Sequence, residues 1–213
     1  MLRGISLSGL GRNDAAIEEL NSVINALNHA SDQDTLVDSL EARAGAFLGM
    51  GIVDKAVSDI ERVQTIDGLT VSNLNLKAQS EFLMEDYKAA SNCYRKAITI
   101  DSLHADSFAQ LAVIQACCPS HTLRDGQQAE ENARQACELS AWNDWTHISV
   151  LAAAKAEQGD FEQAVEFAEW SLRLAPKREK EERQERIDQY RNNEPMRLPA
   201  TRPRIAFRRN RLA

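Results

Sequence analysis

Residues that could bind a metal ion or react as nucleophiles are concentrated in one stretch, CCPSHTLRDGQQAEENARQAC, which covers residues 117–137. Its three cysteines and His121 carry the thiolate and imidazole groups that hold zinc in proteins. Neighbouring residues of a helix point about 100° apart, however, which places Cys117 and Cys118 awkwardly for one tetrahedral ion. We therefore expect these thiols to be packed in the interior and predict no metal site.

No recognisable catalytic arrangement is present elsewhere in the sequence. The four histidines have no serine, cysteine or carboxylate at a catalytic spacing, and the motifs GxGxxG, GxxxxGK[ST], HExxH and GxSxG are absent. Arg124, Asp125 and Gly126 form a permutation of the adhesion triplet Arg-Gly-Asp, and their residue types suit a turn and a helix cap. The sequence therefore predicts a protein that is not an enzyme, with no catalytic residue, cofactor or metal.

The composition favours helices as the elements that position these residues. Apolar residues make up 43% of the chain and charged residues 27%, which is ordinary for a globular protein with a buried core. Gly and Pro number only nine and five, whereas good helix formers such as Ala, Leu, Glu and Gln recur. The four cysteines form no CxxC pair, and neither a signal peptide nor an apolar run of about 18 residues is present. We expect an all-α protein of the cytoplasm that does not enter a membrane.

Charge is distributed unevenly along the chain. The net charge is −7, but six arginines lie from Arg197 onward with no acidic residue among them, so subtracting these six from −7 leaves −13 for the rest. An acidic surface repels nucleic-acid phosphates, and only the basic tail is suited to bind them. The charge therefore argues against nucleic acid as a partner of the main body.

Small residues recur in one frame. The segments GIVDKAVSDIERVQTID, EDYKAASNCYRKAITID and GDFEQAVEFAEWSLRLAP each begin with Gly or Glu and place an alanine, Ala56, Ala90 or Ala164, a few residues later. Ala56 and Ala90 are 34 residues apart, a period typical of solenoids built from helix pairs. Another helical pattern precedes each segment, so each unit is expected to be a helix, a tight turn and a second helix.

These positions resemble the tetratricopeptide repeat family, in which small and aromatic residues occupy fixed places on two helices. The matching residues are Leu74, Ala78, Tyr87, Ala90, Tyr94 and Ala97 in one unit and Ile148, Leu151, Ala152, Phe161, Ala164 and Pro176 in another. The Cys-rich stretch and its ACEL helix resemble a subtype found in bacterial multi-repeat proteins, some of which are serine/threonine kinases. No kinase motif is present in this sequence, so that activity is not implied.

The resemblance implies an all-α fold, an α-solenoid of about five helix-turn-helix repeats closed by a capping helix. The expected units lie near residues 1–34, 35–70, 71–104, 105–143 and 144–177. Residues 177–193 are expected to form the charged capping helix, and residues 194–213 a basic, disordered tail. The first unit lacks its leading helix, as expected of a frayed cap or of a piece of a longer repeat protein.

The Cys-rich stretch falls between the two helices of the fourth unit. The frame alanine of this unit is Ala129, which lies 39 residues after Ala90, five more than in the regular repeat. Pro119 is expected to end the first helix because it has no N–H to donate, and Asp125 is expected to cap the second. In this register Cys118 packs between the helices of its unit, whereas Cys117 faces the edge of a groove.

In this family the first helices of successive units line a concave wall that binds extended peptides or partner helices. Carried over to this sequence, the partner-binding residues of the wall are expected to be Asn75, Gln79, Phe82, Gln110, Val113, Ser149 and Ala153. None of them is basic, so the chaperone-type clamp that holds C-terminal carboxylates with lysine and arginine is not expected. Amides and apolar groups suit a neutral or basic extended segment, and the arginine-rich tail of the protein itself or of a neighbouring copy is one candidate. The alternative is that these are ordinary exposed helix residues that bind no ligand.

Two classes of function stay open on the sequence alone. The first is a protein–protein interaction scaffold that binds an unidentified protein or extended peptide on its concave surface, either alone or as part of a larger multidomain protein. The alternative is a nucleic-acid-associated adaptor that contacts phosphates through residues 197–211. Salt-dependent binding of DNA or RNA that is lost with the tail would favour the second class.

Overall fold

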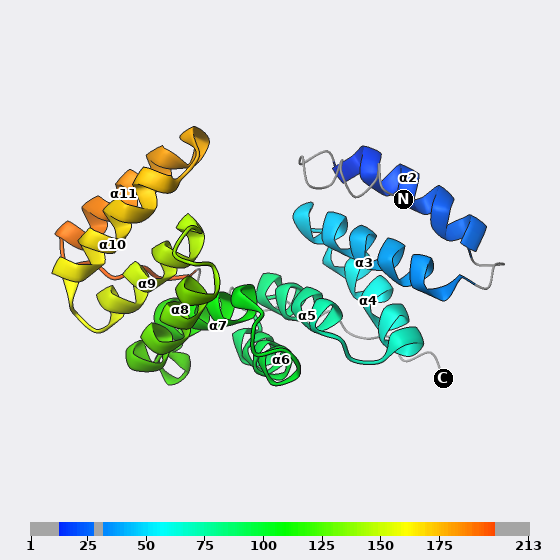
Figure 1. The fold of residues 1–213 in the computed structure, drawn as a ribbon, viewed down its shortest axis with the longest axis horizontal. Coiled ribbons are helices and arrows are strands. Elements are labelled where there is room, and N and C mark those ends of the chain that lie inside the picture. The colour runs from blue at the N-terminus through cyan, green and yellow to red at the C-terminus, as the bar shows by residue number, and fades with distance from the viewer. Residues whose placement is uncertain (1–12, 28–31, 199–213) are drawn as a thin grey trace, which may run out of the picture.

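The computed structural model describes residues 13–27 and 32–198 (Figure 1). These residues form α-helices joined by short turns, with two short 3-10 turns and no β-strand among them. The helices are α2 (Asn13–Leu27), α3 (Gln33–Gly49), α4 (Val53–Asp67), α5 (Val71–Leu83), α6 (Tyr87–Ile100), α7 (Ala105–Cys117), α8 (Gly126–Leu139), α9 (Trp145–Glu157), α10 (Phe161–Leu174) and α11 (Lys180–Arg191). The start of the first expected unit and the tail beyond Leu198 lie outside the described residues.

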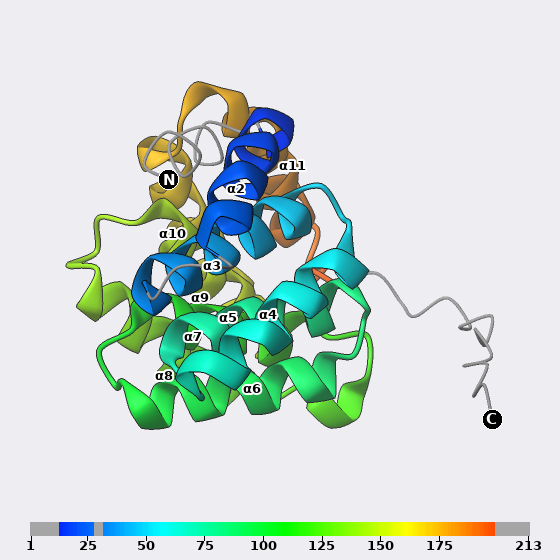
Figure 2. The same cartoon turned by 90° about the vertical axis from the view of Figure 1, so that its right-hand side faces the viewer.

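Consecutive helices pack against each other in sequence order, so the chain advances as a solenoid. Helices α3, α5, α7 and α9 are the first members of helix pairs, and α4, α6, α8 and α10 are the second members. The pairs form a curved array whose two arms rise on either side of α5, α6 and α7 (Figure 1). Figure 2 views the array from the side of the α2–α4 arm. The all-α solenoid predicted from the sequence is confirmed.

The alanines of the repeat frame lie at fully buried positions. Ala56, Ala90, Ala129 and Ala164 have 0% exposed surface, and so has Ala16 of α2, which keeps the same frame. A small side chain lets two helix backbones approach closely, whereas a larger one would hold them apart. The alanine frame therefore sets how closely the helices pack.

The tight turn inside a helix pair has the same backbone geometry in three units. The residue that opens each aligned segment has a positive φ, which is 72° at Gly51, 61° at Glu85 and 82° at Gly159. The N–H of the following residue donates to the carbonyl five residues earlier, at 2.9, 2.8 and 3.0 Å. This pattern closes a helix end, and glycine adopts it without the penalty that a side chain carries.

The elongated turn of the fourth unit has the two end points predicted for it. Helix α7 ends at Cys117, two residues before Pro119, and a 3-10 turn covers His121–Leu123. The carboxylate of Asp125 accepts a hydrogen bond from the N–H of Gln128 at 3.0 Å, so Asp125 caps α8 as expected.

Helix α11 closes the array by packing against α10. Its sparse apolar residues, Ile187 and Tyr190, are buried together with Ala164 and Ala168 of α10. A 3-10 turn over Lys177–Glu179 precedes it, so the expected charged helix begins a few residues later than 177. A mostly polar last helix covers the face that the final repeat leaves open.

Residues 194–198 differ from the expected disordered tail. Met196 and Leu198 are partly buried against apolar clusters of the array, and the N–H of Leu198 donates to the carbonyl of Cys117 at 2.8 Å. The sequence did not signal this order because the residues that hold the segment lie far away along the chain. The remainder of the expected tail, residues 199–213, lies outside the described residues.

Candidate functional site

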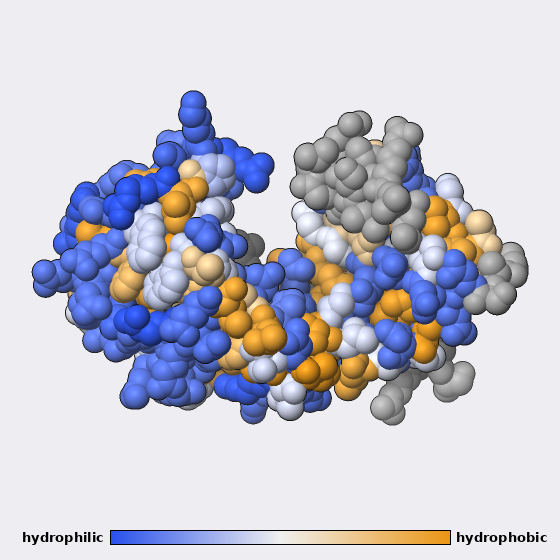
Figure 3. All heavy atoms as spheres, in the orientation of Figure 1, coloured by the Kyte–Doolittle hydropathy of each residue, from blue (hydrophilic) through white to orange (hydrophobic). Residues whose placement is uncertain are grey.

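A cleft with a volume of about 710 Å³ lies between α5 and α7. Figure 3 shows the face between the two arms as hollowed, with apolar residues over its base. Helix α5 contributes Val71, Ser72, Asn75, Leu76, Gln79, Phe82 and Leu83 to the lining, and the remaining lining residues are Tyr94, Asp101, His104, Asp106 and Gln110. The cleft is thus built mainly from the first helices of two successive pairs.

The cleft exists because α5 and α7 approach each other less closely than the other first helices do. Helices α7 and α9 are in extensive contact, and α3 and α5 are in moderate contact, whereas α5 and α7 touch at very few points. The array is therefore most open at this junction. Space that a tighter superhelix would fill with its own side chains is left accessible.

Four of the seven residues expected on the partner-binding wall meet in this cleft. They are Asn75, Gln79, Phe82 and Gln110. Val113 is partly buried farther along α7, and Ser149 and Ala153 belong to α9, so none of these three lines the cleft.

The cleft offers two amide groups above an apolar floor. Gln79 on α5 and Gln110 on α7 are exposed and make no hydrogen bond to another described residue. The ring of Phe82 packs edge-on against Tyr87, with centroids 5.2 Å apart and planes at 79°. Leu83 is exposed beside it. These groups are able to form hydrogen bonds and apolar contacts with a ligand.

Polar contacts link the first helices of successive units, and α9 to α11. The pairs are Glu41 with Ser72, Asn75 with Ser107, Asp106 with His147, and Ser149 with Arg183. We call them the inter-repeat pairs. Glu41, Asn75 and Ser149 occupy corresponding positions on α3, α5 and α9, and Asp106 lies about one turn earlier on α7. The sequence placed these residues on the concave wall but not in these contacts, because each partner lies about one repeat farther along the chain.

The inter-repeat pairs change the role expected for Asn75. Its Oδ1 accepts the Ser107 hydroxyl at 2.9 Å, and its Nδ2 donates to the carbonyl of Val71 at 2.8 Å. The side-chain amide is therefore engaged at both ends. Asn75 lines the cleft, but it fixes the distance between α5 and α7, and the free amides of the cleft are those of Gln79 and Gln110.

His147 joins three helices. Its ring is 4% exposed and lies 3.0 Å from both the Ser140 hydroxyl and the Asp106 carboxylate. Burial lowers the pKa of His147, but the hydrogen bond to Asp106 and the nearby carboxylates outweigh it and leave the pKa raised. The same hydrogen bond holds the pKa of Asp106 below its usual value. The Ser140 hydroxyl donates to the carbonyl of Ala136 at 2.9 Å, so this group is a helix joint and not an activated nucleophile.

The wall over α7 and α9 is covered by the protein's own C-terminal residues. Ala153 lies in a buried cluster against which Met196 and Leu198 pack. The hydroxyl of Ser149 accepts a hydrogen bond from Arg183 of α11 at 3.0 Å. Ser149 and Ala153 are therefore occupied within the chain.

The expectation that Cys117 faces the edge of a groove is wrong. Cys117 is 1% exposed and Cys118 0%, because Leu198 and Met196 pack over the cluster that contains Cys117. Burial raises the pKa of the Cys117 thiol to about 12. Cys118 packs with the apolar core of α5, α6 and α7, as expected.

All four cysteines are free and buried. Within residues 13–27 and 32–198, no three His, Cys, Asp or Glu side chains are placed to hold one metal ion. No helix of the same ranges has the length and apolar character needed to cross a membrane.

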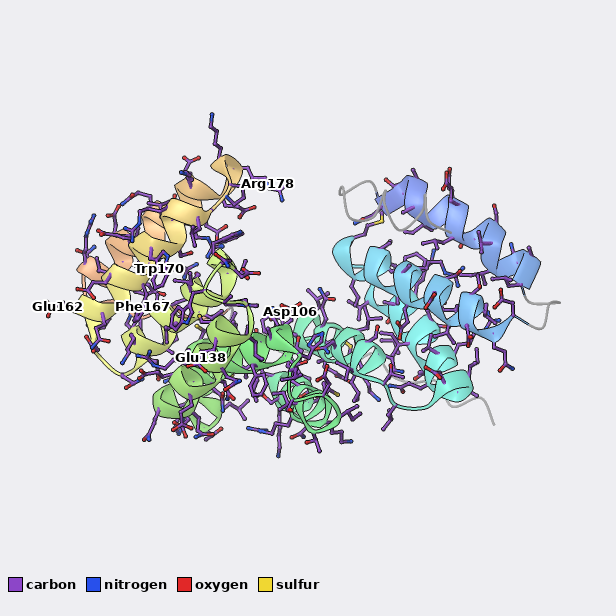
Figure 4. The ribbon with its side chains drawn as sticks, in the orientation of Figure 1. Asp106, Glu138, Glu162, Phe167, Trp170 and Arg178 are labelled. Carbon is purple, nitrogen blue, oxygen red and sulfur yellow. The ribbon has the colours of Figure 1, made fainter. Side chains whose placement is uncertain are left out.

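An aromatic cluster that the sequence did not single out lies against α8 and α10. The rings of Trp142 and Trp170 stack with centroids 5.4 Å apart and planes at 6°, and Phe167 lies 6.4 Å from Trp170. Figure 4 shows Phe167 and Trp170 on α10, far from Asp106 at the base of the two arms. The cluster packs on the buried Leu151 and is not part of the cleft. Its signal in the sequence is the spacing of three between Phe167 and Trp170, which places both rings on one helix face.

Comparison with known proteins gives both a matching repeat and matching folds. Residues 71–102 match the model of the tetratricopeptide repeat family. A thermophilic tetratricopeptide repeat protein of Thermus thermophilus is 19% identical, with a TM-score of 0.70 over 90% of this chain and 97% of that chain. MamA is 18% identical, with a TM-score of 0.57 over 85% of this chain and 96% of that chain. The C-terminal part of a repeat-containing protein from Cytophaga hutchinsonii is 15% identical, with a TM-score of 0.59 over 89% of this chain and 70% of that chain. A search of curated proteins found no match.

The fold is that of a tetratricopeptide repeat solenoid. The chain contains one segment that matches the tetratricopeptide repeat model, and this repeat comprises α5 and α6, which contribute one wall and part of the floor of the cleft. The general role that this class supports is that of a protein–protein interaction scaffold.

Proposed function

We propose that the protein is an interaction scaffold that binds an extended segment of a partner protein in the cleft between α5 and α7. The observation that carries this proposal is the pair of exposed amides, Gln79 and Gln110, on the two walls of the cleft. An extended peptide presents unpaired backbone N–H and C=O groups, and a carboxamide both donates and accepts. The two glutamines are therefore suited to bind a peptide backbone.

The remaining chemistry of the cleft defines the partner further. Its volume of about 710 Å³ falls within the range of pockets that enclose a ligand. Leu76, Phe82 and Leu83 supply apolar contact, and Asp101 and Asp106 supply negative charge. No Lys or Arg belongs to the lining. This composition supports a neutral or basic segment with apolar side chains.

A photoreactive amino acid placed at Gln79 or Gln110 tests the proposal. We expect crosslinks to a partner from both positions and none from the matched control Lys96, which is exposed on α6 and does not line the cleft. Equal crosslinking from Lys96 and from the two glutamines would contradict binding in the cleft.

The cellular location of the protein is also a proposal. Four free, buried thiols support a reducing compartment, so we place the protein in the cytoplasm, either alone or as part of a larger multidomain protein.

For the nucleic-acid alternative, the one tail arginine that the structure describes, Arg197, is paired with Glu157 at 2.7 Å. The scaffold is the function that the geometry supports best.

A further inference from the structure

The chain that follows α11 turns back across the C-terminal ends of α7 and α9. Met196 packs on the alanines of α9, and Leu198 packs on the clusters that contain Cys117 and Cys118. Arg197, between them, places its guanidinium 2.7 Å from the carboxylate of Glu157. The bound segment thus has the pattern large apolar, arginine, large apolar.

The end of α7 supplies acceptors that this segment satisfies. The last carbonyls of a helix have no partner within the helix. The carbonyl of Gln115 accepts the N–H of Asp125 at 2.8 Å, inside the elongated turn. The carbonyl of Cys117 accepts the N–H of Leu198 at 2.8 Å, and that of Ala116 accepts Arg197 Nη1 at 3.4 Å. The carbonyls of Ala116 and Cys117 at the end of α7 therefore accept hydrogen bonds from donors outside the repeat.

Electrostatics favours an arginine at the same place. The C-terminal end of a helix carries partial negative charge, which attracts a cation. The Glu157 side chain is 14% exposed, and its Oε1 is held by Arg124 Nε at 2.8 Å. Because Arg124 also donates to the carbonyls of Cys118 and Pro119, the elongated turn fixes Glu157 independently of the segment. The carboxylate is positioned before any ligand arrives.

We propose that the ends of α7 and α9 form a second recognition site, for an extended partner segment with an arginine between two large apolar residues. Residues 196–198 occupy this site as an internal substitute for the partner. The inference rests on the scaffold function proposed above, but it concerns a separate surface, because Ala116, Cys117, Ala153 and Glu157 do not line the cleft between α5 and α7.

The internal segment is suited to exchange. Among the described residues, it is held by the backbone hydrogen bond of Leu198, the charged side chain of Arg197 and the apolar side chains of Met196 and Leu198. Its tether to α11 gives it an effective concentration on the order of millimolar, so it excludes a short free peptide of modest affinity. A partner that binds the cleft as well gains the same tethering advantage and displaces the segment.

Fluorescence anisotropy of a labelled peptide with the sequence of residues 194–200, EPMRLPA, tests the proposal on the full chain. The titration compares the unmodified protein with the variant Met196→Ser, Arg197→Glu, Leu198→Ser, which keeps α11. We expect the variant to bind the peptide about tenfold more tightly, because the tethered competitor no longer occupies the site. A peptide with Glu in place of its Arg is expected to bind neither protein.

Two further substitutions in the same variant locate the peptide. Glu157→Gln is expected to weaken peptide binding about tenfold or more, because the arginine loses its charged partner. Gln79→Ala, in the cleft, is expected to leave the affinity unchanged. Failure of the crosslinking from Gln79 and Gln110 would contradict the proposed function without affecting this titration, so the two proposals fail separately.

Three results would overturn the second site. The first is a folded triple variant that does not bind the peptide, and the second is equal binding of the Arg and Glu peptides. The third is a dimer of the unmodified chain that becomes a monomer in the variant, since that would make a second copy the occupant. If the triple variant does not fold, Arg197→Ala alone is titrated, and an affinity equal to that of the unmodified chain contradicts the proposal.

Discussion

At the scale of single residues, the frame alanines test the packing of the solenoid. Ala90 and Ala164 are fully buried, so Ala90→Leu or Ala164→Leu is expected to lower the free energy of unfolding by about 1–3 kcal/mol through overpacking. Chemical denaturation measures this change. The matched control is Ala26→Leu, at an exposed position of α2, for which a change within about 0.5 kcal/mol is expected. Equal stability of all the variants would disprove the assigned frame.

The contact between His147 and Asp106 gives stability that depends on pH. A raised histidine pKa adds stability that is fully present below the unfolded value near 6.5 and is lost as the pH rises through the folded value. A lowered aspartate pKa adds stability above 3.8 that is lost as the pH falls through the folded value. The contact between His147 and Asp106 therefore contributes most to the stability of the fold between about pH 3.8 and pH 6.5.

Asp106→Asn is accordingly expected to lower the melting temperature more at about pH 5.5 than at about pH 8.5, because only the protonated imidazole forms the ion pair. Thermal unfolding at the two pH values measures the difference. Asp54→Asn, on the exposed side of α4, serves as the control and is expected to change both values equally. An equal loss at both pH values for Asp106→Asn would exclude the charged pair.

The rate at which Cys117 reacts with a thiol reagent reports whether Met196 and Leu198 are packed over it. Because Cys117 is buried and its pKa is raised to about 12, we expect it to react slowly with a thiol reagent at neutral pH in the native protein. Removing the apolar cover by Met196→Ser and Leu198→Ser is expected to speed the reaction of Cys117, while Cys137, which lies in the cluster of α8 and α9, is unaffected. Mass spectrometry of labelled peptides distinguishes the sites, and rapid labelling of Cys117 in the unmodified chain would contradict the packed segment.

At the scale of the elements, the turn between α5 and α6 carries backbone strain that its counterparts avoid. Glu85 has a φ of 61°, where the other two aligned turns have glycine. A residue with a side chain is disfavoured in this region by roughly 1–2 kcal/mol. Glu85→Gly is therefore expected to raise the free energy of unfolding by about 0.5–1 kcal/mol, after the entropy of the added glycine is deducted. Glu81→Gly, inside α5, is the control and is expected to destabilise by about 1 kcal/mol.

The sequence could predict those elements whose cause is local. The positive-φ position of Gly159, the cap of Asp125 and the buried frame alanines each follow from a few neighbouring residues. The inter-repeat pairs and the order of residues 194–198 could not be predicted, because their partners lie one or more repeats away. For the candidate site, the register identified Gln79 and Gln110 as wall residues. It could not show that Asn75 is already engaged, or that Ala153 is covered.

At the scale of the whole molecule, the charge of the concave face sets its selectivity. The cleft lining holds Asp101 and Asp106 and no Lys or Arg, so a peptide that ends in acidic residues and a free carboxylate finds no permanent counter-charge there. We expect no measurable binding of such a peptide by titration calorimetry. A peptide of equal length with basic residues is the control. Micromolar affinity for the acidic peptide would overturn the assignment of partner charge.

The sparse contact between α5 and α7 has a mechanical consequence. The two arms of the array are stiffened by close helix contacts. At their base, the hydrogen bond from Ser107 to Asn75 links α5 and α7 directly, and the remaining packing between them runs through α6. We expect bending to be concentrated where these first helices touch least, so that each arm moves as a lever with its pivot at the cleft. A ligand wedged between α5 and α7 changes the span between the arm tips by more than it changes the cleft itself. The width of this one junction therefore determines which larger bodies fit between the two arms.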